Sequence, residues 1–250
     1  MSSNVGSGRP VALVTGAARR IGATIARHLH AAGYDVVLHF RRSRADVDAL
    51  VAELERARAG STLALEADLG DVDALAPLVA SAVQRFDRLD ALVNNASAFY
   101  PTLVGTATAQ QWDELFGANA RAPFFLAQAA APHLAGRGGA IVNLVDIYAE
   151  RPLQDHAIYC MSKAALALMT KALARDLAPR VRVNGVAPGA VLWPDAGKPG
   201  AEQAALIERT PLRRTGTPDD VAGAVLWLLR DATFVTGEIV RVDGGRHVVG

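Results

Sequence analysis

The stretch Val11–Gly22 reads VALVTGAARRIG and joins a short apolar run to a glycine turn and a helix-prone segment. In α/β proteins, a glycine turn between a strand and a helix lets the backbone approach a ligand closely, and the unpaired N–H groups of the helix can bind a pyrophosphate. Gly16 permits the tight turn, and Gly22 permits close packing of the helix on the strand. The stretch therefore predicts a strand, a phosphate-binding turn and a helix.

The same alternation of β-prone runs and Ala/Leu-rich segments continues along the chain, and it is typical of a parallel sheet with crossover helices. Seven helical segments are expected, of which Ile21–Ala32 and Asp46–Ala59 end at Gly33 and Gly60, residues that can adopt the left-handed C-cap conformation. We predict an α/β fold, a single doubly wound parallel sheet of about seven strands with helices on both faces. The expected strands are Val11–Thr15, Asp35–His39, Thr62–Ala67, Ala91–Asn94, Ala140–Val145, Arg182–Val186 and Ile239–Val242.

The composition excludes several classes of protein. Of 250 residues, 51% are hydrophobic and 20% are charged, with a formal net charge of +1. Such a chain can bury a large core, and it offers no basic field for nucleic acid. The segment Met1–Pro10 is polar, and no apolar run reaches the roughly 18 to 20 residues of a membrane span. A single cysteine, Cys160, fits a reducing compartment. We expect a cytoplasmic protein that binds neither nucleic acid nor membranes.

The end of the second expected strand indicates which dinucleotide the glycine turn would bind. NAD-binding chains place a carboxylate about 20 residues past the turn, where it contacts the ribose 2′-hydroxyl. Here residues 39–43 read HFRRS and contain no acid. Arg offers paired donors to a dianion, so Arg41, Arg42 and Ser43 suit a 2′-phosphate. We expect NADPH as the cofactor, with a solvated basic loop as the alternative.

Tyr159 and Lys163 lie four residues apart in an expected helix, so their side chains are neighbours on one face. A nearby ammonium group stabilises a phenolate and lowers the pKa of the tyrosine from about 10 toward neutrality, which would make it a usable general acid. From about Pro10 to Gly245, the chain resembles the short-chain dehydrogenase/reductase family. The motifs that carry the resemblance are Thr15–Gly22, Asn94-Asn95-Ala96, Tyr159-x-x-x-Lys163, Pro188-Gly189 and Val242–Gly245.

The resemblance implies a flexible tail at residues 1–9 and one Rossmann-like, NADP-binding catalytic domain at 10–250. It also implies hydride transfer between a nicotinamide and a substrate, with Tyr159 as proton donor and Lys163 orienting the ribose. Asn119 would support a water-mediated proton relay, and a polar surface position is its alternative. By analogy we expect a homotetramer. Asn94 would lie beside the cofactor, and the cofactor-binding residues would be Gly16, Arg20, Ile21, Gly22, His39, Arg41, Arg42, Ser43, Asp68, Leu69, Asn95, Ala96, Ser97, Tyr159, Lys163, Pro188 and Gly189.

Two departures from the family pattern narrow the substrate. The family usually has a serine 13 residues before the tyrosine, where it hydrogen-bonds a substrate carbonyl, but position 146 here is Asp. An ionised carboxylate cannot donate a hydrogen bond, and beside Tyr159 it would raise the pKa of the phenol. It suits a substrate with ring N–H donors, or one protonated on nitrogen as a C=N bond is reduced. Arg20 replaces the middle glycine of the turn and places a cation between the phosphates and the substrate pocket.

These departures, together with NNASAFYPT at Asn94–Thr102, resemble pteridine reductases. The resemblance implies NADPH-dependent reduction of a C=N bond in a dihydropterin or related pterin. Phe99 would stack the pterin against the nicotinamide, because a flat π-system favours such packing. Asp146 and Tyr159 would relay a proton to the ring nitrogen, and Arg20 would bridge a cofactor phosphate and the substrate. The implied substrate-binding residues are Arg20, Ser97, Phe99, Asp146, Tyr159 and Trp193, and the catalytic ones are Asp146, Tyr159, Lys163 and Asn119.

Two connections that follow strands are long enough to act as lids over the carboxyl edge of the sheet, Phe99–Ala109 and Gly189–Gly200. We expect a substrate loop at about 189–212. Within it, Val191–Pro194 would form the rim of the pocket and Trp193 an apolar wall, although a core or interface tryptophan is the alternative. The segment Leu103–Gln111 is short compared with the insertions of the parasite enzymes. Dihydromonapterin and dihydrofolate therefore stay open as substrates beside biopterin.

Two other functions stay open. A reductase of carbonyl compounds is disfavoured by the missing serine at position 146, and a non-catalytic NADPH sensor by the presence of Tyr159 and Lys163. His28 and His30 are two residues apart on a predicted helix and face different directions, so no metal site is expected. No G-x-S-x-G sequence occurs, which removes the commonest reading as an α/β hydrolase.

Overall fold

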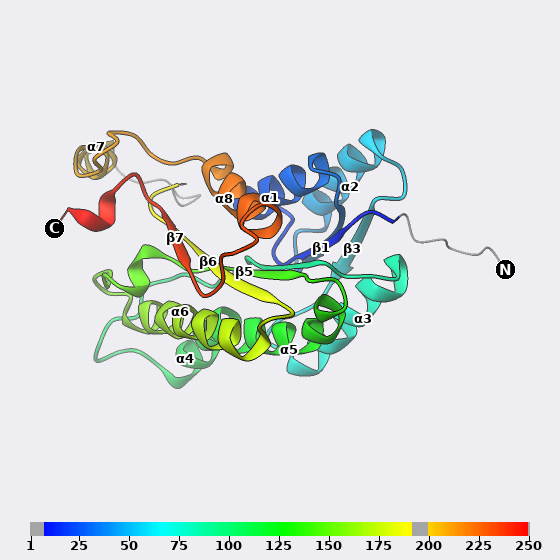
Figure 1. Ribbon diagram of the computed structural model, residues 1–250. Helices are drawn as coiled ribbons and strands as arrows, with labels where there is room; N and C mark the ends of the chain where they lie inside the picture. Colours follow the sequence, from blue (N-terminus) through cyan, green and yellow to red (C-terminus); the bar gives the residue numbers. More distant parts are fainter. Residues whose placement is uncertain (1–7, 192–199, 250) are drawn as a thin grey trace.

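The structure is a computed structural model that describes residues 8–191 and 200–249 (Figure 1). Seven parallel strands form one sheet in the order β3-β2-β1-β4-β5-β6-β7, so the direction of winding reverses between β1 and β4. The predicted fold class is confirmed, and each predicted strand agrees with the structure to within two residues. The strands are β1 (Val11–Val14), β2 (Asp35–Phe40), β3 (Thr62–Glu66), β4 (Ala91–Asn94), β5 (Ala140–Leu144), β6 (Arg182–Pro188) and β7 (Ile239–Val242).

Helices cover both faces of the sheet. Helices α1, α2 and α8 lie on one face, and α3, α5 and α6 lie on the other (Figure 1). Successive residues of β1 serve the two faces in turn, because strand side chains alternate: Ala12 and Val14 pack in the first core, and Val11 and Leu13 in the second. The helices are α1 (Arg20–Ala31), α2 (Arg44–Ala57), α3 (Leu75–Phe86), α4 (Ala109–Phe116), α5 (Ala122–Ala135), α6 (Ala157–Leu177), α7 (Gly200–Glu208) and α8 (Pro218–Arg230).

The two predicted glycine C-caps have different outcomes. Gly33 has φ +97° and follows the last residues of α1, as predicted. Helix α2 instead ends at Ala57, and Arg58 is already extended with φ −156°, so Gly60 lies in the turn that leads to β3. The Arg58 guanidinium donates to the carbonyls of His30 and Tyr34. These two hydrogen bonds attach Arg58 to the region where α1 ends. Glycine spacing alone could not predict that α2 ends before this residue.

Helix α6 is long and apolar enough to cross a membrane by length and composition alone, the one such helix in the described ranges. In the fold it lies against β6 and buries the side chains of Ser162, Lys163 and Thr170. Core helices pass the same test of length and composition, so we interpret α6 as a core helix.

The loops at the carboxyl edge are tied together by backbone contacts. The connection after β4 returns to the start of α6, where the N–H of Thr102 donates to the carbonyl of Asp155 and Thr102 bridges to His156. At the other edge, Arg9 donates from Nε to the buried Asp35 carboxylate at 2.9 Å. The residues after β4 and those that begin α6 are therefore brought together at the edge where β1 and β4 diverge.

Candidate active site

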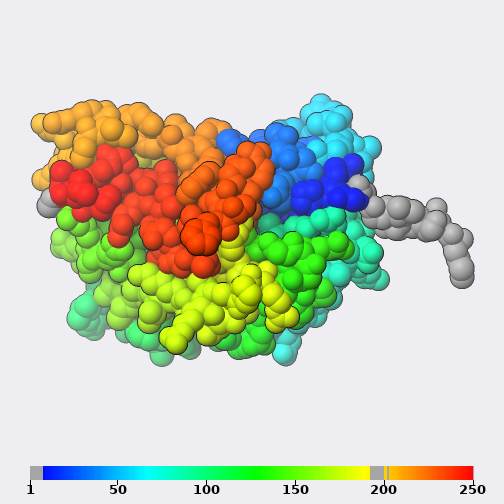
Figure 2. Space-filling model, viewed as in Figure 1, coloured from blue at the N-terminus to red at the C-terminus, as the bar shows by residue number. Residues whose placement is uncertain are grey.

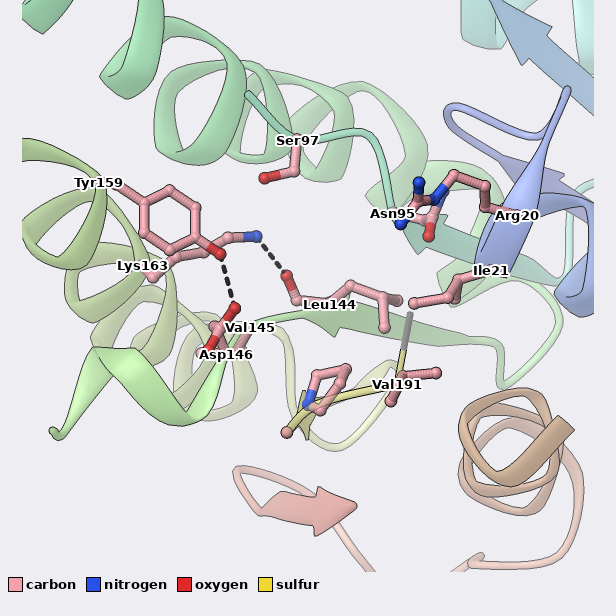
Figure 3. Close-up of a pocket in the computed structure, with 12 residues that line it drawn as sticks. Arg20, Ile21, Asn95, Ser97, Leu144, Val145, Asp146, Tyr159, Lys163 and Val191 are labelled. Atoms are coloured by element: carbon pink, nitrogen blue, oxygen red, sulfur yellow. Dashed lines mark hydrogen bonds between the residues drawn. The ribbon is translucent and has the colours of Figure 1, made fainter. Parts of the chain in front are cut away.

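Two adjoining cavities run along the carboxyl edge of the sheet. The larger is a cleft of about 1370 Å³ over the glycine turn and the ends of β2 and β3. The smaller is a pocket of about 190 Å³ that contains Asp146, Tyr159 and Lys163 (Figure 3). The residues that line both cavities are Arg20, Ile21, Asn95 and Ser97. An elongated ligand in the cleft can therefore reach the chemical groups of the pocket.

Three polar side chains meet in the pocket (Figure 3). The Tyr159 hydroxyl donates to Asp146 Oδ2 at 2.6 Å, and the Tyr148 N–H donates to Asp146 Oδ1 at 2.9 Å. Lys163 lies one turn after Tyr159 on α6, and its Nζ donates to the Leu144 carbonyl at 2.8 Å. Asp146 caps a short 3₁₀ turn at Ile147–Ala149 directly after β5. The sheet edge and α6 thus fix both ends of the Asp146–Tyr159 hydrogen bond.

The pKa values in the pocket differ from the expectation based on spacing. Burial and the neighbouring Asp146 carboxylate raise the pKa of Tyr159 far above its usual range, so the expected lowering by Lys163 is wrong. The Lys163 ammonium is 5.9 Å from the centre of the Tyr159 ring, and burial lowers its own pKa to about 8. Burial also raises the pKa of Asp146. Near neutrality the phenol keeps its proton and can donate it.

A buried histidine at the floor of the cleft holds the glycine turn in place. His39 is 2% exposed, its Nδ1 accepts from the Gly16 N–H at 3.1 Å, and its Nε2 lies 3.1 Å from the Ala67 carbonyl. This arrangement requires a neutral ring with its proton on Nε2, and burial lowers the pKa of His39 accordingly. His39 therefore positions the turn from the end of β2.

Arg20 occupies a backbone conformation that favours glycine. Its φ is +54°, which costs a residue with a Cβ about 1 to 2 kcal/mol. This accounts for the glycine at the equivalent place in the usual family pattern. Because Arg20 lines both cavities, it lies where the cleft and the pocket adjoin.

The two adjacent asparagines after β4 have different surroundings. Asn95 lines both cavities, and its Nδ2 donates to the carbonyls of Thr15 and Gly16. Asn94 is 3% exposed, donates to Asn143 Oδ1 at 2.8 Å, and lines neither cavity. The expected place of Asn94 beside a cofactor is therefore corrected, because alternate strand residues point to opposite sides.

Asn119 is buried, and both the oxygen and the nitrogen of its side-chain amide form hydrogen bonds. Its Oδ1 accepts from the Ser97 hydroxyl and the Ala98 N–H, both at 2.9 Å. Its Nδ2 donates to Ser162 Oγ at 2.9 Å and to the Ala98 carbonyl at 3.0 Å. The alternative of a surface position is thus wrong. Asn119 lies in a π-helical segment, Gly117–Arg121, that joins α4 to α5, and such segments are frequent at functional sites.

The aromatic side chain expected to stack on a substrate has a partner that sequence reasoning missed. Phe99 is half exposed and lines neither cavity; its ring stacks on His156 at 4.8 Å and meets the edge of Tyr159 at 4.7 Å. His156 lies three residues before Tyr159, a helical spacing that could have suggested the contact. Trp193 and Pro194 lie outside the described residues, whereas Val191 lines the pocket.

Apart from Asn94, the structure places every residue expected to contact a cofactor along the two cavities. Those on the turn, β2, β3 and β4 line the cleft, and Tyr159, Lys163, Pro188 and Gly189 line the pocket. Sequence reasoning missed the opposite wall of the cleft, although its helical spacing was a usable signal. That wall is formed by Tyr100, Gln110, Asp113, Glu114, Gly117, Ala118 and Arg121.

The chemistry of the cleft suits a ligand that carries phosphate groups. Arg41 and Arg42 are exposed at its β2 end; Arg41 lies 3.7 Å from Asp68, and Arg42 forms no ion pair with any described residue. A Cβ on Gly22 would lie 2.1 Å from the Gly16 carbonyl oxygen, so only glycine lets α1 pack this closely against the turn. Cations at one end and helix N–H groups at the turn match a phosphate-bearing ligand.

Comparisons with known proteins agree with this arrangement. A family described as enoyl-(acyl carrier protein) reductase matches residues 16–247. Three similar proteins cover nearly the whole chain. An uncharacterized oxidoreductase of Methylorubrum extorquens is 40% identical over 94% of this chain and 96% of its own. Pteridine reductase 1 of Leishmania tarentolae is 38% identical over 94% and 96%. A putative ketoacyl reductase 2 of the granaticin polyketide synthase of Streptomyces violaceoruber is 41% identical over 96% and 97%.

Proposed function

This chain belongs to the short-chain dehydrogenase/reductase family, and from that premise we propose that it is an NADPH-dependent reductase of a dihydropterin or related pterin. The family consists of oxidoreductases that use a nicotinamide cofactor. The proposal concerns the narrower points, namely the phosphate on the cofactor and the C=N bond that is reduced. The observation that carries it is the Tyr159 hydrogen bond to Asp146 in the pocket that Arg20 also lines.

The carboxylate at position 146 favours a nitrogen heterocycle over a ketone. An ionised carboxylate accepts hydrogen bonds, so it can hold a ring N–H or amino group but cannot polarise a carbonyl by donating to it. The pocket places this acceptor beside a phenol that keeps its proton near neutrality. An acceptor and a proton donor side by side match a ring that presents an N–H next to a nitrogen awaiting protonation.

In the proposed reaction, this chain's residues hold and move one proton. Bound NADPH supplies the hydride to carbon. Tyr159 Oη gives its proton to the adjacent ring nitrogen, so the C=N bond becomes CH–NH and the net reaction consumes one proton from solvent. The ionised Asp146 then takes up a proton from solvent and passes it to Tyr159 Oη, which restores the hydrogen bond between the two side chains. Lys163 places a positive charge in the same pocket, which offsets the negative charge left when the phenol gives up its proton.

The residues that would hold NADPH lie along the cleft. The turn at Gly16–Gly22 and the start of α1 would take the pyrophosphate. Arg41, Arg42 and Ser43 would take the 2′-phosphate, and Asp68 and Leu69 would lie beside the adenine. Each of these lines the cleft, which supports the assignment.

The experiment that tests the function follows NADPH absorbance with dihydrobiopterin, dihydromonapterin, dihydrofolate and a panel of ketones and 3-ketoacyl thioesters. We expect turnover of at least one pterin, and a loss of about 100-fold or more in Tyr159→Phe, as for removal of a general acid. Turnover of carbonyl compounds without turnover of any pterin would contradict the proposal. Binding of NADPH with no turnover would indicate a sensor.

A reductase of carbonyl compounds is the second candidate. The observation that favours it is the 41% identity to a putative ketoacyl reductase. The observation against it is Asp146, because a carboxylate lines the pocket at the position where the family usually has a serine donor. The ketone panel above separates the two candidates directly.

We further propose a homotetramer in the cytoplasm. Helices α4, α5 and α6 expose large apolar side chains, Trp112, Phe124, Met161 and Leu168, which are 41% to 70% exposed in the single chain. Apolar side chains on adjacent helices are typical of an interface between copies. Light scattering after gel filtration should give about four times the chain mass of 26.3 kDa, and Leu168→Glu should lower it. A monomer mass for the unchanged protein would reject this part of the proposal.

A further inference from the structure

The end of β7 and the residues after it contact the residues that follow Asp146. We call Arg241–Val249 the C-terminal segment and Asp146–Arg151 the Asp146 loop. Arg241 donates to both oxygens of Glu150 at 2.7 Å. Arg151 donates to the Val249 carbonyl at 2.5 Å and, more distantly, to that of Arg246 at 3.5 Å. In Figure 2 the C-terminal residues, in red, form part of the surface beside α7 and next to the green middle of the chain.

The C-terminal segment is held firmly at its own start. Asp243 is 8% exposed, and its carboxylate accepts from the N–H groups of Gly245 and His247 at 2.9 and 2.7 Å and lies 2.8 Å from His247 Nδ1. A Cβ on Gly189 would lie 2.7 Å from Asp243 Cβ, so Asp243 packs directly against a residue of the pocket. The segment is thus attached both to the pocket wall and to the Asp146 loop.

Arg246 places its positive charge where the C-terminal segment meets the Asp146 loop, and this placement costs stability. Its guanidinium carbon lies 5.8 Å from the centre of the Tyr148 ring, and its buried Nη1 has no hydrogen-bond partner among the residues that the structure describes. An unpaired buried donor costs about 1 to 3 kcal/mol, so a residue of this kind is expected to serve a purpose other than stability. Tyr148 is also the residue whose N–H donates to Asp146 Oδ1.

The charged and titratable groups that face Asp146 come from several elements. Tyr159, Cys160 and Lys163 come from α6, Tyr148 from the Asp146 loop, and Arg246 from the C-terminal segment. Arg20 lines the same pocket from the glycine turn. Burial raises the pKa of Asp146, whereas the positive charges of Lys163 and Arg246 lower it.

We propose that Arg246 is a positioning residue whose charge, held against Tyr148, favours the ionised form of Asp146, the form that accepts the Tyr159 hydrogen bond. The C-terminal segment delivers this charge through its contacts with Tyr148, Glu150 and Arg151. The inference rests on the proposed function only for the statement that Asp146 takes part in proton transfer. The effect of the Arg246 charge on the ionisation of Asp146 does not depend on which substrate the protein binds.

The test compares Arg246→Gln with Arg246→Lys and with Arg230→Gln. Arg230 is an exposed cation at the end of α8 that pairs with Asp231, so its replacement removes the same charge away from the pocket. The pKa of Asp146 is measured by NMR on protein labelled with ¹³C at aspartate carboxyls, with the resonance assigned through Asp146→Asn. In Arg246→Gln we expect it to rise by about 0.5 to 1 pH unit, with a matching shift of the acid limb of kcat/KM for the dihydropterin.

Arg246→Lys should restore both values, and Arg230→Gln should change neither. NADPH affinity should stay within about twofold, and the melting temperature should change little, because the lost guanidinium has an unpaired N–H. An unchanged Asp146 pKa in Arg246→Gln would overturn the inference, as would a fall in activity with a lower melting temperature and no shift. A shifted NMR titration in a protein that turns over no pterin would support the inference and reject the proposed function.

Discussion

Asp146 and Tyr159 share one proton across 2.6 Å, and this makes the two side chains one chemical unit. Both pKa values are raised by burial, and the carboxylate further raises that of the phenol. When two groups interact this strongly, the protons leave in steps that belong to the pair. Rate measurements against pH should therefore report the pair, and substitutions at either position should change the same step.

Asp146→Ser should separate pterin reduction from cofactor binding. Serine restores the donor that carbonyl reductases of this family use, and it removes the acceptor that a pterin needs. We expect kcat/KM for the dihydropterin to fall about 100-fold or more, while the Kd for NADPH stays within about twofold. Steady-state kinetics and fluorescence titration measure the two quantities. Equal losses in both would mean that Asp146 holds the cofactor or its loop instead of the proton path.

Arg42→Asp should change the choice of cofactor. The new carboxylate would repel a 2′-phosphate and could accept a bond from a 2′-hydroxyl. Loss of a charged hydrogen bond costs about 1.5 to 3 kcal/mol, so the Kd for NADPH should rise roughly 10- to 100-fold while that for NADH falls.

Arg44→Asp is the matched control for that experiment. Arg44 is also exposed, but it pairs with Glu66 and does not line the cleft. Its replacement should leave both dissociation constants unchanged. If Arg42→Asp behaves in the same way as Arg44→Asp, residues 41–43 are only a solvated loop.

Most of the residues that line the cleft and the pocket could be predicted, because their places depend on residue identity and spacing. Tyr159, Lys163 and Asp146 meet as predicted, and the residues of the cleft come from strand ends that a parallel sheet must gather. The hydrogen-bond partners of Asn119 could not be predicted. They depend on how the connection after β4 folds back onto α6, which local sequence does not encode.

At the scale of elements, the contact between α1 and the turn after β1 leaves no room for an additional methyl group. The absent Cβ of Gly22 leaves room for the Gly16 carbonyl oxygen and the Asn95 amide. Gly22→Ala should therefore push α1 away from the turn, at a cost of about 1 to 3 kcal/mol in the free energy of unfolding and with weaker NADPH binding.

Gly223→Ala provides the control because it also lies inside a helix, α8, with nothing within 4 Å of an added Cβ. It should stabilise the protein by about 0.5 to 1 kcal/mol. Thermal or urea unfolding and an NADPH titration on both variants measure the contrast. Equal effects of the two substitutions would show that helix propensity alone decides the outcome.

The bounds of helices and strands could be predicted where the spacing of apolar residues determines them. They could be predicted less well where hydrogen bonds of single side chains determine them. The sequence of Ala109–Ala135 predicts one long helical segment, and the structure divides it at Gly117–Arg121 into α4, a π-helical segment and α5. The period of apolar residues cannot distinguish a π turn from an α turn. The buried amide of Asn119 and its four bonds mark this position, and they become visible only in three dimensions.

At the scale of the whole molecule, the burial of the Lys163 ammonium group lowers the stability of the folded protein. The pKa of Lys163 falls from 10.5 to about 8 because it is buried, which corresponds to about 3 kcal/mol. The unfolded chain then binds more protons than the folded one between pH 8 and 10.5, so the folded protein should gain stability as pH rises through that range. Below pH 8 the whole cost is present.

Chemical unfolding at pH 7 to 10 tests this account. Lys163→Met should lose the rise in stability with pH that the unchanged protein shows. Lys171→Met, at an exposed position on the same helix, should keep it. A flat profile for the unchanged protein would mean that water reaches Lys163 in solution.

The contact between the C-terminal segment and the Asp146 loop has a consequence for how the enzyme is made. During translation the glycine turn, Asp146 and Tyr159 emerge well before β7, and domains can begin to fold as they leave the ribosome. Arg241 and Arg246 reach Glu150 and Tyr148 only after every other strand has been synthesised. A nascent chain can thus build most of the cleft early, whereas Asp146 acquires its final surroundings last.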